Sequence, residues 1–265
     1  MRAYILLSLI ISTAIAAPSS RLVIGGENTS IERYPFFANI QLRLFQLLLL
    51  HCAGSLLTPD AVLTAAQCFS LKNPSSYRLR LGSPMASYGG DSHDVSEIII
   101  HEEFDEGSLA HDVAILRLTS SAQESATIGF ARIPSRSYSL PDNTPVSVVN
   151  FGQYAGLDPS FPVIVIHKAD VFTINQQTCA DRYAVLNNQT GSETTRDVTE
   201  GMICSGVLDV GGQDVCMSGE GSPLVYGEDI VVGVTSWVHR CGDAHYPRVN
   251  TRVASYSDWI VGNVV

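Results

Sequence analysis

The nine residues from Cys216 to Leu224 read CMSGEGSPL, and their only acidic side chain is Glu220. A carboxylate can act as a nucleophile, as it does in glycosidases and some phosphatases. Asp112 is a second candidate carboxylate, and two facing carboxylates can hydrolyse a glycoside. What Glu220 can do therefore depends on the side chains that the fold places beside it.

The elements that must position these carboxylates are short apolar segments, broken by Gly, Pro, Asn and Asp. Strands at this spacing, with turn residues between them, indicate an all-β barrel or sandwich. Only the end of the chain has a helical pattern, with Val253, Tyr256, Trp259 and Ile260 on one face. The strands expected are Tyr77–Leu81, Val95–Ile100, Val113–Leu118, Val146–Val149, Val163–Ile166 and Ile230–Val234.

The composition is that of a globular, acidic protein. Of its 265 residues 45% are hydrophobic and 16% are charged, and the formal net charge is -10. The negative charge argues against nucleic-acid and anionic-membrane partners. Lysine occurs only at Lys72 and Lys168. Because arginine keeps its charge at high pH and lysine does not, this bias suits an alkaline fluid; compositional drift explains it equally well.

The first residues predict export. Residues 1–16 form an apolar run that ends in Ala14-Ile15-Ala16, which is typical of a cleaved secretory signal. Residues 17–22 are then a short pro-segment, and residues 23–265 form one domain. We expect a secreted, extracellular protein with no membrane span. Two sequons make Asn28 and Asn188 candidate glycosylation sites.

Six cysteines in an exported chain predict three disulfides, although spacing alone leaves 15 pairings open. No C-x-x-C pair or H-E-x-x-H helix occurs, so we expect no metal site and no cofactor.

Seven segments stand out as ordered motifs: Val23–Gly26, Cys52–Leu56, Thr64–Cys68, Asp112–Leu116, Cys216–Leu224, Ser236-Trp237 and Tyr246–Val249. Together these motifs resemble the chymotrypsin/trypsin-like serine peptidases. The resemblance extends from residue 23 to the C-terminus. Its less specific features, in Thr173–Gln176 and Cys204–Asp214, look most like larval midgut trypsin-like proteases of moths. It implies two six-stranded antiparallel β-barrels with a C-terminal α-helix, and the disulfides Cys52–Cys68, Cys179–Cys204 and Cys216–Cys241.

The resemblance places the catalytic triad at Gln67, Asp112 and Glu220, of which only Asp112 has the family's residue. An amide cannot take a proton near neutral pH, so Gln67 is no general base, although its NH₂ can still donate to Asp112. Glu220 replaces the serine nucleophile, and the loss of one triad member costs about 10⁴–10⁶-fold in well-studied enzymes. The family geometry also turns the aspartate away from substrate, which disfavours the glycosidase alternative.

The neighbouring positions are also altered. The oxyanion hole would use the backbone N–H groups of Ser218 and Glu220, where the family has glycine and serine. Gly219 replaces the aspartate that normally receives the new N-terminus on activation, so the chain is expected to resemble a zymogen. In the specificity pocket, Asp214 matches the trypsin carboxylate.

The two walls of that pocket are not the family's glycines. They are Val238, which would narrow the entrance, and Arg248, which could pair with Asp214.

These replacements predict that the chain is not an enzyme but a pseudoprotease, acting as a binding or regulatory protein for an unknown protein or glycan partner. The apolar segment from Leu42 to Leu50 favours such a surface; a longer buried strand explains it equally well. The alternative is a serine-endopeptidase family member with residual or altered hydrolase activity centred on Glu220. We expect a monomer.

Overall fold

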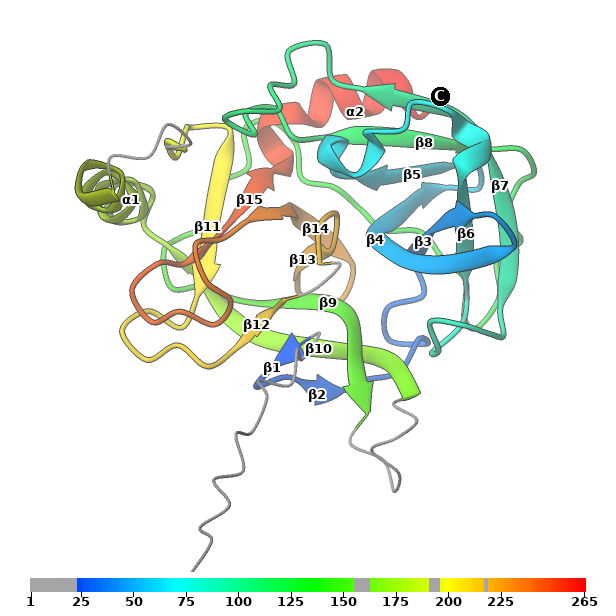
Figure 1. Ribbon diagram of the computed structural model, residues 1–265, viewed down its shortest axis with the longest axis horizontal. Helices are drawn as coiled ribbons and strands as arrows, with labels where there is room; N and C mark the ends of the chain where they lie inside the picture. The colour runs from blue at the N-terminus through cyan, green and yellow to red at the C-terminus, as the bar shows by residue number, and fades with distance from the viewer. Residues whose placement is uncertain (1–22, 155–162, 191–195, 217–218) are drawn as a thin grey trace, which may run out of the picture.

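The computed structural model describes residues 23–154, 163–190, 196–216 and 219–265, which form two β-barrels side by side (Figure 1). The first barrel is closed in the order β3-β4-β5-β8-β7-β6, and all its pairings are antiparallel. Its strands are β3 (Phe37–Leu44), β4 (Leu47–Thr58), β5 (Ala61–Thr64), β6 (Tyr77–Leu81), β7 (Asp91–Ile100) and β8 (Ala114–Leu118).

The second barrel runs in the order β11-β15-β14-β13-β9-β10 and closes through a pairing of β11 with β10. The short β2 (Glu27–Asn28) extends it at β10, and β1 (Val23–Ile24) pairs with β12 (Asp214–Val215). The expected pair of six-stranded antiparallel barrels is therefore confirmed. The strands are β9 (Pro145–Tyr154), β10 (Val163–Ile174), β11 (Met202–Gly206), β13 (Pro223–Tyr226), β14 (Ile230–Trp237) and β15 (Arg248–Arg252).

Alternation of side chains explains why these segments form barrel walls. In β6, Tyr77, Leu79 and Leu81 are buried, while Arg78 and Arg80 between them are half-exposed. Successive side chains of a strand point to opposite faces, so one face fills the barrel and the other meets solvent.

Within the described residues, two α-helices accompany the barrels. The expected C-terminal helix is present as α2 (Ser257–Asn263), preceded by a 3₁₀ turn, Val253–Tyr256, and it crosses to the side of the first barrel (Figure 1). The other helix, α1 (Gln176–Thr190), lies beside β11 of the second barrel and was not expected. This helix buries few of its side chains, chiefly Cys179 and Tyr183, so it lacks the broad apolar stripe that reveals a helix in a sequence.

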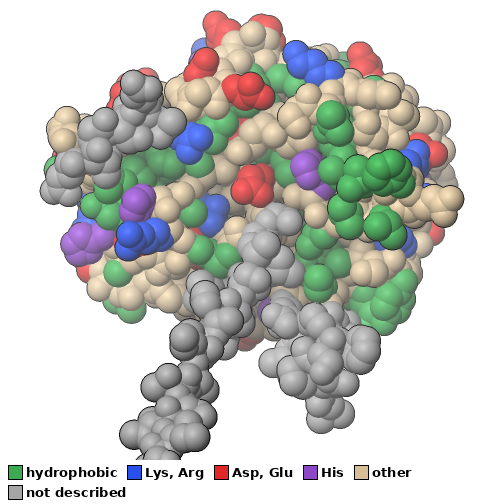
Figure 2. All heavy atoms as spheres, in the orientation of Figure 1, with side chains coloured by type: hydrophobic (Ala, Val, Ile, Leu, Met, Phe, Trp, Pro, Cys, Tyr) green, Lys and Arg blue, Asp and Glu red, His purple; other side chains and the backbone are tan. Residues whose placement is uncertain are grey.

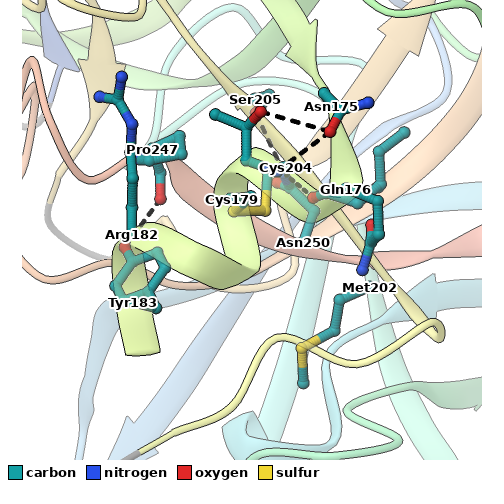
Figure 3. The surroundings of a disulfide bond; sticks show 12 residues. Asn175, Gln176, Cys179, Arg182, Tyr183, Met202, Cys204, Ser205, Pro247 and Asn250 are labelled. Carbon is teal, nitrogen blue, oxygen red and sulfur yellow. Dashed lines mark hydrogen bonds between the residues drawn. A yellow bond between two sulfur atoms is a disulfide. The ribbon is translucent and has the colours of Figure 1, made fainter. Parts of the chain in front are cut away.

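All three disulfides join the cysteines that the resemblance implied, Cys52–Cys68, Cys179–Cys204 and Cys216–Cys241. Figure 3 shows how Cys179, in the first turn of α1, fixes this helix to Cys204 of β11. One turn further along, the Tyr183 hydroxyl donates to the Pro247 carbonyl over 2.8 Å. The disulfide and this hydrogen bond together hold a weakly amphipathic helix in place.

The segment from Leu42 to Leu50 combines the two structures that its sequence allowed. It is paired, as the end of β3 and the start of β4, yet its tip is exposed. Phe45 is 92% exposed, and Leu44, Leu47 and Leu49 are also exposed. Apolar side chains gather over this hairpin in the right half of Figure 2. We call these four residues the apolar hairpin tip.

The expected signal (residues 1–16) and pro-segment (residues 17–22) lie outside the described residues and remain predictions. Within the described part of the chain, none of the helices has the length and apolar character needed to cross a membrane. Asn28 and Asn188 are both exposed, as a modified asparagine must be.

Candidate functional site

Asp112 is fully buried at the junction of the two barrels and accepts hydrogen bonds on both carboxylate oxygens. Oδ1 accepts from the backbone N–H of Gln67 over 2.9 Å. Oδ2 accepts from the Gln67 side chain over 2.6 Å and from the Ser236 hydroxyl over 2.5 Å. Burial raises the pKa of Asp112 by disfavouring its charge, and these donors oppose that rise. Both oxygens of the Asp112 carboxylate are therefore occupied by structural hydrogen bonds, and the buried group does not face a substrate.

Gln67 lies in a 3₁₀ turn of the first barrel, Ala66–Phe69, and reaches across to the second. Besides Asp112, its Nε2 donates to the carbonyl oxygen of Ser236 over 2.9 Å. Both neighbours are acceptors, so the NH₂ end of the amide must face them. The expected donation from Gln67 to Asp112 is present, and it leaves the amide oxygen as the group not engaged by this network.

Glu220 is half-buried, in the turn that leads into β13. Its carbonyl oxygen accepts from the Ala53 N–H of β4 over 2.9 Å, which ties the second barrel to the first. The following residue, Gly221, has φ +79°, and a Cβ there would lie 2.1 Å from the Ala53 carbonyl oxygen. The backbone is therefore held tightly, and the turn requires glycine after Glu220.

Of the expected oxyanion pair, Ser218 lies outside the described residues, so the structure does not place this pair. Gly219 is buried against Val215 of β12. A carboxylate in place of Gly219 would have to displace the Val215 side chain, since even a Cβ would lie 3.1 Å from it.

Arg248 and Asp214 form a buried, bidentate ion pair in the second barrel. Arg248 Nε donates to Asp214 Oδ1 over 2.5 Å, and Nη2 donates to Oδ2 over 3.0 Å. Nη2 also donates to the Val215 carbonyl oxygen. The two remaining acceptor sites of Asp214 receive the backbone N–H groups of Val215 and Gly242, at 2.8 and 3.0 Å. The carboxylate therefore has a complete set of donors.

The other expected wall residue, Val238, follows directly after β14 and is half-buried. Trp237, just before it, packs edge-on against Tyr183 with ring centroids 4.7 Å apart. Whether Asp214, Val238 and Arg248 line a specificity pocket remains a prediction.

Two residues around Asp112 were missed from the sequence. Ser236 donates to its carboxylate, and Thr251 of β15 donates through its hydroxyl to the Asp112 carbonyl oxygen over 2.6 Å. Ser236 stood in a family motif that suggested only a pocket wall. Thr251 is buried, and nothing in the sequence distinguished it from other polar residues of the strands.

His111 does not substitute for the missing base. Although it precedes Asp112, its ring stacks on His101 with centroids 5.2 Å apart, and its Nδ1 lies 3.2 Å from the Tyr256 hydroxyl. It belongs to a cluster separate from the Gln67–Asp112 network.

Two closed six-stranded barrels, joined by a buried aspartate and followed by a C-terminal helix, define the trypsin-like fold. A family model described as Trypsin matches residues 23–260. The chain therefore belongs to the trypsin family.

Relatives over the full length agree with this assignment. "Trypsin, alkaline A" of Manduca sexta is 36% identical over 99% of this chain and 100% of its own length. "Trypsin CFT-1" of Choristoneura fumiferana is 33% identical over 97% of each chain. The "Vitellin-degrading protease" of Bombyx mori is 28% identical over 96% of this chain and 92% of its own length.

The prediction that the chain is not an enzyme is wrong, because these relatives are named as trypsins and a protease. The prediction rested on the replacements at Gln67 and Glu220 and on the altered residues Ser218, Gly219, Val238 and Arg248. The two barrels and the family match over residues 23–260 are those of a protease family.

Proposed function

We propose that this chain is a hydrolase of the trypsin family whose activity is altered and centred on Glu220. The observation that carries the proposal is a contrast in exposure at the barrel junction. Asp112 is fully buried and Gln67 is tied to it, whereas Glu220 is half-exposed on a tightly held backbone. Among these three residues, Glu220 is the acid that a substrate can reach.

The chemistry available to Glu220 favours activated acyl groups. A carboxylate oxygen adds to the acyl carbon of an ester, and the leaving oxygen departs with the bonding electron pair. Water then hydrolyses the acyl anhydride and restores the carboxylate. An amine leaving group must be protonated as it departs, and the Gln67 amide cannot supply that proton. Aryl esters are therefore the preferred substrates, and peptide bonds are cleaved far more slowly.

The test compares hydrolysis of an aryl ester and of a peptidyl anilide by pure protein, after contaminating serine proteases are inactivated with a phosphonate. Glu220→Gln keeps the side-chain shape but removes the carboxylate, and we expect it to lose at least about tenfold in ester hydrolysis. Glu228→Gln, which changes an exposed acid elsewhere, is the control. Equal rates for the native chain and Glu220→Gln would refute the proposal.

A second candidate function is binding through the apolar hairpin tip, and it can coexist with hydrolysis. The supporting observation is the exposure of Leu44, Phe45, Leu47 and Leu49 together on one hairpin. Affinity capture from the secreting tissue tests it. Phe45→Ser with Leu47→Ser should abolish capture of a partner, whereas Val210→Ser, at another exposed apolar residue, should not.

We propose export of the chain on the strength of residues 1–16 and of its trypsin relatives. Sequencing the N-terminus of the protein from culture medium tests this. Ala17 as the first residue would show signal cleavage alone, and a start at Leu22 would show cleavage after Arg21 as well. Retention of Met1 would exclude a cleaved signal.

A further inference from the structure

His101, Glu103 and His111 bring two imidazoles and one carboxylate together on the first barrel. One ligand atom from each of the three residues lies within 4.8 Å of the other two. The carboxylate oxygen of Glu103 is 3.8 Å from Nδ1 of His111. We propose that these three residues form a zinc-binding site, independent of the proposed hydrolase chemistry.

The donor set selects the class of metal. Two imidazole nitrogens and one carboxylate oxygen suit Zn²⁺, whereas Ca²⁺ and Mg²⁺ prefer oxygen ligands throughout. Three protein ligands leave the fourth position of a tetrahedral ion to water. The residues are spread over a loop, which explains why a search of the sequence for an H-E-x-x-H helix found no metal site.

Small movements bring the three groups to zinc. Ligands about 2.0–2.2 Å from a tetrahedral ion lie roughly 3.3 Å from one another, so the gaps must close by up to about 1.5 Å. The Glu103 side chain is 69% exposed and that of His111 is 37% exposed, so both can turn. His101 is buried, and its ring packs against Tyr256 and Trp259, which makes it the fixed ligand.

The backbone is arranged to present His111. This residue has φ 57°, a left-handed conformation that is uncommon outside glycine, and its carbonyl oxygen accepts from the Val113 N–H over 2.8 Å. The tight turn sets its ring parallel to that of His101, at an interplanar angle of 16°. Without this turn, the side chain next to Asp112 would not lie beside His101.

The surrounding charge favours a cation. The pocket beside the cluster is lined by Glu103, Glu200 and Asp258, with Arg136 as the one basic residue among its described lining residues. Arg136 is already paired with Asp258 over 3.1 Å. The site therefore keeps a negative balance that attracts a metal ion.

A bound ion would join the two ends of the loop between β7 and β8. His101 follows β7 directly and its N–H donates to the Val113 carbonyl oxygen over 3.1 Å, just before β8. Zinc would add a second, stronger closure at the same point, adjacent to Asp112. Its binding would therefore stabilise the folded protein by mass action.

The test is calorimetric titration of metal-free protein with ZnCl₂, followed by thermal unfolding with and without zinc. We expect one ion per chain, a dissociation constant on the order of 1–100 µM, and a raised Tm. His111→Asn and Glu103→Gln, both at exposed positions, should each weaken binding at least about tenfold. Neither residue belongs to the Gln67–Asp112–Glu220 site, so ester hydrolysis reports separately on the proposed function.

His245→Asn is the matched control, because His245 also has a carboxylate, that of Asp209, at 3.8 Å from its Nδ1. It should leave the affinity unchanged. The proposal is overturned if zinc does not bind, if calcium binds equally well, or if the His111 and Glu103 variants bind zinc as the native chain does. Loss of binding in His245→Asn alone would assign the ion to that surface pair and overturn the proposal as well.

Discussion

Arg248 neutralises Asp214 from within the same barrel, through two hydrogen bonds of 2.5 and 3.0 Å between side chains that are 4% and 7% exposed. In trypsins, the family resemblance assigns this carboxylate to an incoming Arg or Lys side chain. Here an arginine of the chain itself occupies it. A second cation would have to be buried without a free counter-charge, which is costly.

Benzamidine tests this occupancy. The native chain should show no rise in Tm with benzamidine, because Asp214 is already paired. Arg248→Gly with Val238→Gly frees the carboxylate and costs about 3–5 kcal/mol of stability, since it leaves a buried charge unpaired. Added benzamidine should recover part of that loss. Tight benzamidine binding by the native chain would contradict the internal pairing.

Restoring the serine alone should not restore serine chemistry. Glu220→Ser places a hydroxyl at the junction, but the Gln67 amide donates to Asp112 and Ser236 and cannot accept its proton. We expect no labelling of this variant by a fluorophosphonate probe. Gln67→His with Glu220→Ser supplies a base beside Asp112 and should be labelled, but slowly, because Ser218, Gly219 and Arg248 still differ from the family's residues. Labelling of the single variant at the rate of the double variant would show that another group acts as base.

Lys168 should contribute stability in alkaline solution. Its side chain is 13% exposed and pairs with Asp170 over 2.7 Å and with Glu27 over 3.0 Å. The hydrogen bond that Lys168 donates to the Asp170 carboxylate is the main cause that raises the pKa of Lys168. Because the folded pKa exceeds the unfolded value, this stability is fully present below pH ~10.5 and is lost as the pH rises through the folded pKa.

Denaturant unfolding between pH 8 and 12 measures this contribution. Lys168→Met should be less stable than the native chain at pH 8, and the difference should shrink toward pH 12. Lys72→Met, at an exposed lysine, provides the comparison. A constant difference across the range would mean that the ion pair contributes nothing to folding.

Gly221 should tolerate no side chain. A Cβ there would lie 2.1 Å from the Ala53 carbonyl oxygen and 2.4 Å from Thr64 Oγ1, at φ +79°. Gly221→Ala should therefore cost about 3 kcal/mol or more. Gly227→Ala also has a positive φ, +67°, but meets nothing within 4 Å, and should cost only about 1–2 kcal/mol. Equal unfolding free energies for the two variants would contradict the steric argument.

The barrels could be predicted because strand patterns and family motifs agree on them. β6 begins and ends where its alternating sequence predicts, and β8 differs by one residue. The disulfide pairing came from the resemblance, since spacing alone left 15 options. Helix α1 could not be predicted, because it lacks a broad apolar stripe. A disulfide and the hydrogen bond of the Tyr183 hydroxyl fix it to the barrel instead.

Contacts in the candidate site could be predicted only where both contacting residues stand at positions of a family motif. The Gln67–Asp112 and Arg248–Asp214 contacts follow from residue types at family positions. The His101–Glu103–His111 cluster depends on one left-handed residue in a loop, and no pattern of side chains in the sequence reveals that conformation.

The C-terminal segment has a consequence for how the chain is made. Val253, Tyr256 and Ile260 are buried in one core cluster with residues of both barrels, such as Leu63 of β5 and Val234 of β14. The ribosome adds these three residues to the chain after it has synthesised every strand of both barrels. This shared core is therefore incomplete until translation has passed both barrels. Its exposed apolar surface must be protected during synthesis, and a chain truncated before Val253 would carry that unprotected surface permanently.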